Sequence, residues 1–268
     1  MKRTLMSLML CAVILMGAVA PMMAASPVLS GIVESNVLRV GMSGSQPPFS
    51  VKSKDGSLIG YEVDLAKLLA NAMGVELKLV EKPFAELLSA LEKGEVDVVM
   101  SGMTMTPARN LKAAFVGPYI ISGKSILTKD KTLAQAQEAG DVNQEDLTIV
   151  ALANSTSQKF VETLMPKANL VKTQDYDEGI KMILEDKATA MVADFPICAL
   201  SAMRYGDQGL VTLAEPLTIE PIGIAISPGD SLMLNMVQNY LVALEAVGVL
   251  DELEAKWFQD GGWLIHLP

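Results

Sequence analysis

The chain contains very few of the residue types that catalysis and metal binding most often use. Among its 268 residues there is one histidine, His266, close to the end. Catalytic triads and most zinc sites depend on histidine, so a single terminal one argues against both. We therefore expect no metal and no cofactor.

Positive charge is also scarce. There are 21 Lys and Arg against 31 Asp and Glu, which gives a formal net charge of −10. A nucleic-acid partner needs basic patches that neutralise phosphates, and a chain of this charge is not expected to bind one.

Long hydrophobic runs are absent except at the beginning of the chain. The run from Leu5 to Ala20 follows two basic residues and precedes a short stretch of small residues, which is typical of a secretory signal peptide. We predict that residues 1–25 are removed, with cleavage after Ala24 or Ala25. Cys11 lies inside the run without the sequence context of a lipoprotein signal, so we expect no lipid anchor. The protein is predicted to be exported to the periplasm.

Removal of this segment changes the charge and the cysteine count. Loss of Lys2 and Arg3 lowers the formal charge from −10 to −12. Cys198 is then the single cysteine, and no internal disulfide is possible. Its apolar neighbours predict a buried, unreactive thiol.

The remaining chain repeats one construction twice. In the first half, apolar or alternating stretches with the length of strands alternate with helical patterns, at 38–42, 60–73, 75–79, 84–93 and 96–100. The second half repeats the order at 147–152, from 155, at 170–173, 177–185 and 188–193. Such alternation predicts an α/β fold with mostly parallel sheets flanked by helices. Two lobes of this kind would leave a cleft between their strand ends.

Two further strands, near 117–127 and 217–226, are predicted to link the lobes, and a helix is expected over 231–258. The first lobe would then be discontinuous, formed by residues 26–122 and 222–268. Residues 123–221 would form the second lobe.

The segment from Gly94 to Arg109 carries the clearest candidate site. Its apolar run ends at Ser101-Gly102, and Thr104 precedes Arg109 by five residues. A guanidinium can hold both oxygens of a carboxylate, and hydroxyl groups beside it add donors. Taken alone, an arginine in a polar loop is more often a surface residue, so this pattern leaves both interpretations open.

Four stretches of the chain resemble the bacterial periplasmic solute-binding proteins of family 3, which serve amino-acid ABC transporters. They are LRVGMSGSQPPFS at 38–50, GYEVDLAKLLA at 60–70, DVVMSGMTMTPAR at 97–109 and MVADFP at 191–196. The resemblance implies a type II periplasmic-binding-protein fold, in which two lobes joined by a two-strand hinge close over an amino acid. It also implies delivery of that ligand to a membrane ABC permease, and we expect a monomer.

The resemblance assigns the ligand's head group to residues of both lobes. Arg109 would clamp the α-carboxylate and Thr104 would donate its hydroxyl to the same group. The carbonyl of Gly102 would accept from the α-ammonium, and Asp194 would supply the counter-charge. Hydroxyl and backbone N–H donors at a helix start would complete the carboxylate site, from Ser155 and Thr156.

Departures from the family pattern bear on the ligand's side chain. Members that take Lys, Arg or His commonly have Asp where this chain has Ser43, and an aromatic residue where it has Gln46. Phe84 would form a wall against the side chain, and Phe49 either supports that wall or belongs to the core. Because none of these residues is negatively charged, we expect a polar uncharged or small neutral amino acid.

An enzyme is the main alternative. Cyclohexadienyl dehydratases share this fold, and a glutamate three residues after the equivalent of Asp194 acts as their general acid. This chain has Ile197 there, which cannot transfer a proton. A receptor's sensor module is a weaker alternative, because no apolar stretch after the signal peptide reaches the length of a membrane span. We therefore expect a binding protein and not an enzyme.

Overall fold

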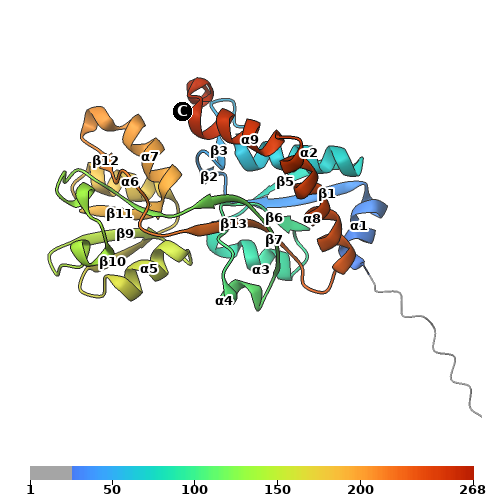
Figure 1. Ribbon diagram of the computed structural model, residues 1–268, viewed down its shortest axis with the longest axis horizontal. Coiled ribbons are helices and arrows are strands. Elements are labelled where there is room, and N and C mark those ends of the chain that lie inside the picture. The colour runs from blue at the N-terminus through green and yellow to red at the C-terminus, as the bar shows by residue number, and fades with distance from the viewer. Residues whose placement is uncertain (1–25) are drawn as a thin grey trace, which may run out of the picture.

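The computed structural model describes residues 26–268, so the predicted signal peptide with Cys11 lies outside the described part. Two five-stranded sheets form two bodies, and long strands cross between them (Figure 1). A small three-stranded sheet, β2 (Ser45–Gln46), β3 (Ser50–Lys52) and β4 (Leu58–Ile59), lies beside the first body. The architecture is the type II periplasmic-binding-protein fold.

The first sheet takes strands from both ends of the chain. Its order is β5-β1-β6-β13-β7, with bounds Glu76–Glu81, Val37–Met42, Val98–Val99, Glu220–Ile226 and Ala114–Ser122. Alternate residues of β1 are fully buried, as an apolar strand inside a sheet requires. The helices of this body are α1 (Pro27–Ser35), α2 (Tyr61–Met73), α3 (Leu87–Glu92), α4 (Pro107–Asn110), α8 (Ser231–Ala246) and α9 (Val249–Glu254).

The second sheet has the order β10-β9-β11-β8-β12. The strands span Asn169–Thr173, Thr148–Leu152, Ala190–Asp194, Lys124–Thr128 and Val211–Thr212. Every residue of β11 is buried, which fits a central strand covered on both faces. The covering helices are α5 (Thr156–Leu164), α6 (Tyr176–Leu184) and α7 (Phe195–Arg204).

Both sheets combine a parallel part with antiparallel crossing strands. β5, β1 and β6 are parallel, as are β10, β9 and β11. β13 runs antiparallel to β6 and β7, and β8 runs antiparallel to β11 and β12, because each crossing strand returns from the other body. The alternating sequence pattern predicted the parallel part only.

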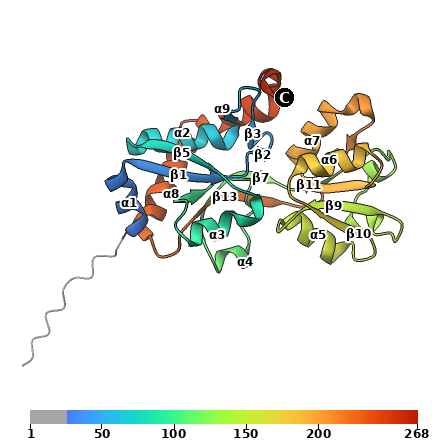
Figure 2. The same cartoon turned by 180° about the vertical axis from the view of Figure 1, so that it is seen from behind.

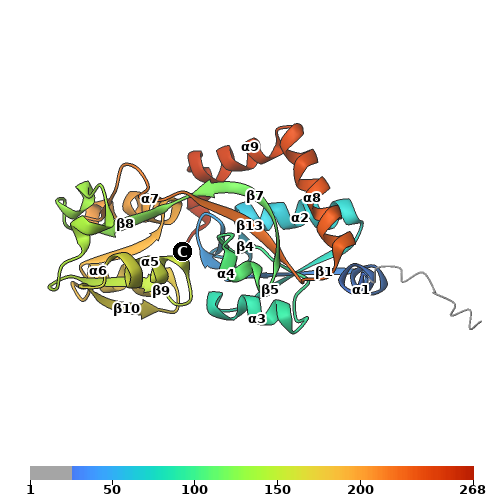
Figure 3. The same ribbon diagram turned by 60° about the horizontal axis from the view of Figure 1, so that its bottom comes forward.

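The chain crosses between the two bodies where β7 leads into β8 (Figure 3), and Gly123 separates these two strands. A Cβ atom there would lie 2.0 Å from the carbonyl oxygen of Thr218, so a larger residue does not fit without backbone movement. The predicted lobe boundary at 122/123 falls at this glycine, and the one at 221/222 falls inside β13. The division into lobes stays a prediction, which the strand membership of the two sheets supports.

Most predicted elements are present, with shifts at their ends. α2 ends at Met73, and Gly74 follows with φ +67°, the left-handed conformation of a helix stop. The second predicted helix is a 3-10 turn, Phe84–Glu86, followed by the short α3. The predicted strand at 96–100 pairs over two residues only.

The long helix expected over 231–258 is not continuous. Gly248, with φ +77°, separates α8 from α9, and the chain bends by 79° between α8 and the helical segment 249–259. Among residues 26–268, no single helix is long and apolar enough to cross a membrane; α8 and the segment 249–259 meet that criterion only as a bent pair.

Candidate ligand-binding site

The candidate site lies where the carboxyl ends of the parallel strands of the two sheets face one another. Ser101 to Thr104 follow β6, and Asp194 ends β11. Thr156 begins α5, which lies on the same side of the crossing strands as α4 (Figure 2). The hydroxyl oxygens of Thr104 and Thr156 are 3.2 Å apart, so the two bodies touch at two of the predicted site residues.

Arg109 is held by its own short helix and by an aromatic ring. Thr106 caps α4 and accepts from the backbone N–H of Arg109. One Nη donates to the carbonyl of Thr104 at 2.8 Å, and the guanidinium lies 5.5 Å from the ring centroid of Phe84. Within residues 26–268, no carboxylate comes within 4.0 Å of this guanidinium. Arg109 therefore retains N–H donors for a carboxylate supplied from outside the chain.

The surroundings of Arg109 act on its charge in two directions. Burial lowers the pKa of Arg109, and the negative charges of Asp194 and Glu220 oppose that effect. An arginine stays protonated in proteins, so the group remains a cation in a partly desolvated place. Arg109, Phe84, Met103 and Asn154 are among the residues that line a cavity of about 310 Å³.

Asp194 is paired with a residue that the sequence did not reveal as part of the site. Lys124, which is 1% exposed, places its Nζ 2.5 Å from Oδ1 of Asp194, itself 4% exposed. Lys124 and Asp194 are direct partners in the antiparallel ladder of β8 and β11. The same Nζ lies 3.2 Å from Oε2 of Glu220.

Glu220, at the start of β13, is the second residue that the sequence did not reveal. Its Oε2 accepts from the hydroxyl of Thr104 at 2.8 Å and from that of Thr156 at 3.0 Å. One available signal was a charged residue within each crossing strand, since Lys124 interrupts an apolar stretch and Glu220 begins another. Buried charges of this kind need partners, and that need points to a polar site.

The predicted side-chain wall is only partly as expected. Oε1 of Gln46 accepts from the hydroxyls of Ser43 at 2.8 Å and Ser101 at 2.5 Å. Gln46 also lies near the buried Tyr176 of the second body, whose pKa burial raises well above its usual value. Ser43 and Gln46 therefore lie at the site as one hydrogen-bonded group.

Phe84 and Phe49 have different surroundings. Phe84 is almost buried and stacks beneath Arg109. Phe49 has no exposed surface and packs edge to face against Phe258 at 5.4 Å between ring centroids. Of the two roles left open for Phe49, the structure favours the core.

Ser155 uses its hydroxyl for the helix start. Its Oγ accepts from the N–H of Gln158 at 3.0 Å and donates to the carbonyl of Leu152 at 2.6 Å. Ser155 is therefore the N-cap of α5, and the side chain of Gln158 accepts from the backbone N–H of Asn154. This leaves Thr156 as the hydroxyl that faces the first body.

Gly102 rests on a buried acid. Its N–H donates to Oε1 of Glu62 at 2.6 Å, the Tyr119 hydroxyl donates to the same oxygen, and Oε2 has no partner among the described residues. Burial raises the pKa of Glu62 to about 7. Gly102 itself has φ +56°, a conformation that favours glycine. Glu62 thus supports the backbone of the site from behind.

Comparison of the chain with known proteins shows which family it belongs to. The model of the bacterial extracellular solute-binding proteins, family 3, matches residues 38–260. The chain belongs to this family.

Individual relatives of this solute-binding protein include both binders and an enzyme. The L-cystine-binding protein TcyJ of Escherichia coli (strain K12) is 28% identical over 233 residues, which are 86% of this chain and 85% of that protein. Cyclohexadienyl dehydratase of Pseudomonas aeruginosa is 26% identical over 231 residues, 86% of each chain. A putative ABC-transporter binding component from Wolinella succinogenes DSM 1740, crystallised with lysine, is 35% identical with a TM-score of 0.82 and covers 86% of this chain and 99% of that one.

Proposed function

We propose that this protein binds an amino acid in the cleft between its two bodies and delivers it, in the periplasm, to a membrane ABC permease. The observation that carries the proposal is Arg109. It is a partly buried cation on the short helix α4, and no carboxylate of the described chain pairs with it. Leaving such a charge unpaired is costly, so a carboxylate ligand is the natural partner.

The opposite wall supplies the complementary charge. Asp194 lies across the site and offers a counter-charge for an α-ammonium, and Thr104 and Thr156 offer hydroxyls to the carboxylate. The names of relatives support this assignment, since one binds L-cystine and a solved neighbour holds lysine.

For the side chain, we infer a polar uncharged or small neutral amino acid. Ser43, Gln46 and Phe84, the residues of the proposed wall, carry no charge. A cationic amino acid is the second candidate, favoured by the lysine complex of the Wolinella protein.

We further infer that the protein binds its ligand without transforming it. Ile197, at the position of the dehydratase general acid, is 1% exposed and belongs to the hydrophobic core. Glu62 has a pKa suited to proton transfer, but its carboxylate is fully buried beneath Gly102 and meets the site only through that backbone.

The test is a thermal-shift screen of protein that has been unfolded and refolded to remove any co-purified ligand. The panel holds the twenty amino acids together with prephenate and arogenate. A ligand present at 100 times its Kd stabilises the folded state by about 2.7 kcal/mol. Stabilisation by one or a few amino acids supports the proposal, whereas a response to prephenate or arogenate alone favours the enzyme.

Arg109→Ala should abolish this response while leaving the protein folded, because the ligand's buried carboxylate would lose its cation, a loss of several kcal/mol, on the order of 3–5. Arg204→Ala is the matched control. Arg204 also stacks on a ring, that of Tyr205, and donates to a backbone carbonyl, that of Pro268. Equal ligand shifts in the two variants would show that Arg109 is not the carboxylate clamp.

A further inference from the structure

The polar contacts proposed for the ligand's head group are already made by two side chains of the protein. The ammonium of Lys124 lies on Asp194, where the ligand's α-ammonium is expected. The carboxylate of Glu220 accepts from Thr104 and Thr156, where the ligand's α-carboxylate is expected. Lys124 and Glu220 in turn form an ion pair of 3.2 Å.

This pair and a ligand compete for the same atoms. A threonine hydroxyl has one proton to donate, so it cannot serve Glu220 and a ligand carboxylate together. Asp194 is buried, and the ammonium of Lys124 would repel a second cation that approached Asp194. Binding therefore requires Glu220, Lys124 or both to move.

The position of the pair connects it with the hinge. Lys124 directly follows Gly123, which packs against the backbone of Thr218, and the backbone N–H of Lys124 donates to the Thr218 hydroxyl at 2.8 Å. Glu220 begins the returning strand β13. Its Oε2 accepts from one hydroxyl of each body, as a ligand carboxylate would.

We propose that Lys124 and Glu220 form an internal counterpart of the amino-acid zwitterion, which holds the two bodies together until a ligand displaces it. This inference rests on the proposed function for the identity of the displaced contacts. The pair makes closure partly independent of ligand and lowers the apparent affinity. If it held the two bodies together about 90% of the time, removing it would strengthen binding up to about tenfold.

The first test measures shape without any ligand. Small-angle X-ray scattering of the refolded protein should give a larger radius of gyration for Glu220→Met than for the unchanged protein. Glu220→Asp, which keeps the charge but shortens the reach to both hydroxyls, should expand in the same direction and covers the case in which Glu220→Met does not fold. Lys129→Met, which removes the exposed ion pair with Asp186, is the control and should not expand.

The second test adds the amino acid that gives the largest thermal shift. It should compact Glu220→Met more than the unchanged protein, and it should bind the variant more tightly. The same radius of gyration in all ligand-free forms would overturn the internal pair, even if amino acids bind. Expansion of the variants with no response to any amino acid would support the pair and count against the proposed function instead.

Discussion

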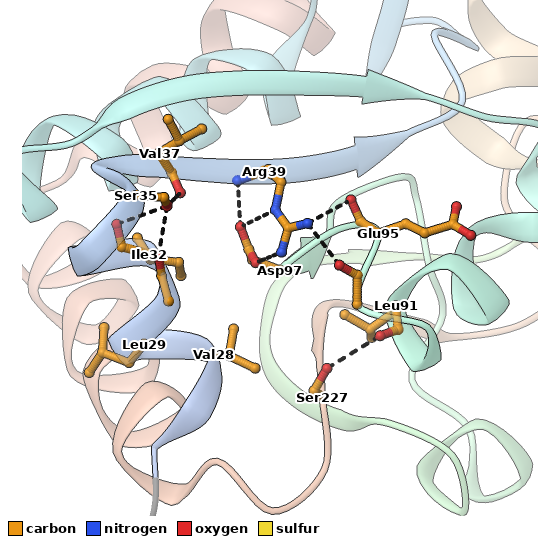
Figure 4. Close-up of polar contacts among 12 residues, drawn as sticks. Val28, Leu29, Ile32, Ser35, Val37, Arg39, Leu91, Glu95, Asp97 and Ser227 are labelled. Atoms are coloured by element: carbon orange, nitrogen blue, oxygen red, sulfur yellow. Dashed lines mark hydrogen bonds and ion pairs between the residues drawn. The ribbon is translucent and has the colours of Figure 1, made fainter.

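Two clusters of charged residues, at opposite ends of the parallel strands, differ in where their members come from. Arg39 on β1 and Asp97 before β6 form an ion pair of 2.5 Å, and Lys124 and Asp194 form another of the same length. Arg39 also donates to the carbonyl of Gly94 at 2.7 Å, and its backbone N–H donates to Asp97 (Figure 4). Every partner in this first cluster belongs to one sheet and its adjoining turn.

The second cluster draws its members from both sheets. Lys124 and Asp194 belong to the second sheet, Glu220 to the first, and the hydroxyls that complete the cluster come from one body each. A charge cluster within one sheet opposes unfolding, whereas one between two bodies opposes their separation. Ion pairs of similar length therefore have different effects: the Arg39–Asp97 pair contributes to the stability of its sheet, whereas the cluster around Lys124 contributes to ligand exchange.

Glu62, a buried acid outside both clusters, sharpens the comparison because it forms no ion pair with any of residues 26–268. Its pKa rises from 4.5 to about 7 on burial, so the folded protein keeps this proton at pH values where the unfolded chain has lost it. Stability from this group is complete below pH 4.5 and is lost as the pH rises through 7, by about 3 kcal/mol. Urea unfolding at several pH values should show this decline in the unchanged protein and its absence in Glu62→Gln. Parallel pH profiles would contradict it.

Breaking the first cluster should affect stability alone. Asp97→Ala leaves the guanidinium of Arg39 and its backbone N–H without their acceptor, which costs about 2 kcal/mol, because Arg39 is 39% exposed and regains water. Urea unfolding measures the loss, and titration with the ligand should give an unchanged Kd. A weakened Kd would show that the two ends of the sheet are coupled.

Breaking the second cluster should change ligand binding more than it changes stability. Lys124→Met is expected to lower the free energy of unfolding by only about 1 kcal/mol, since separation of the bodies lets water reach Asp194 and Glu220. The ligand's Kd should nevertheless decrease, because Asp194 loses the internal cation with which the ligand's α-ammonium competes. A stability loss of about 3–5 kcal/mol with an unchanged Kd would instead mark Lys124 as an ordinary buried ion-pair partner.

The sequence predicted those site residues whose positions follow from local pattern. Thr104 and Arg109 stand just after an apolar strand, and Asp194 ends another, so the strand-end rule placed each of them at the carboxyl edge of its own sheet. Thr156 follows from a helix start that Ser155 marks. Local pattern does not predict that these residues meet across the two bodies; that prediction came from the family resemblance.

Lys124 and Glu220 could not be placed in this way, because their roles depend on strand register. Lys124 meets Asp194 through the antiparallel pairing of β8 and β11. The hydrophobic periodicity of the sequence does not predict which residues of two strands are paired. The break at Gly248 was missed for a related reason, since a continuous helical pattern does not show where a left-handed glycine turns the chain.

The most direct test of the account removes each partner of the proposed contact in turn, the ligand's carboxylate and the guanidinium of Arg109. Isothermal titration calorimetry would compare the stabilising amino acid with its decarboxylated amine, in the unchanged protein and in Arg109→Ala. The account predicts that the unchanged protein loses most of its affinity for the amine, and that Arg109→Ala binds both compounds equally weakly. An amine that binds the unchanged protein as tightly as the amino acid would contradict the assignment of Arg109 and with it the proposed function.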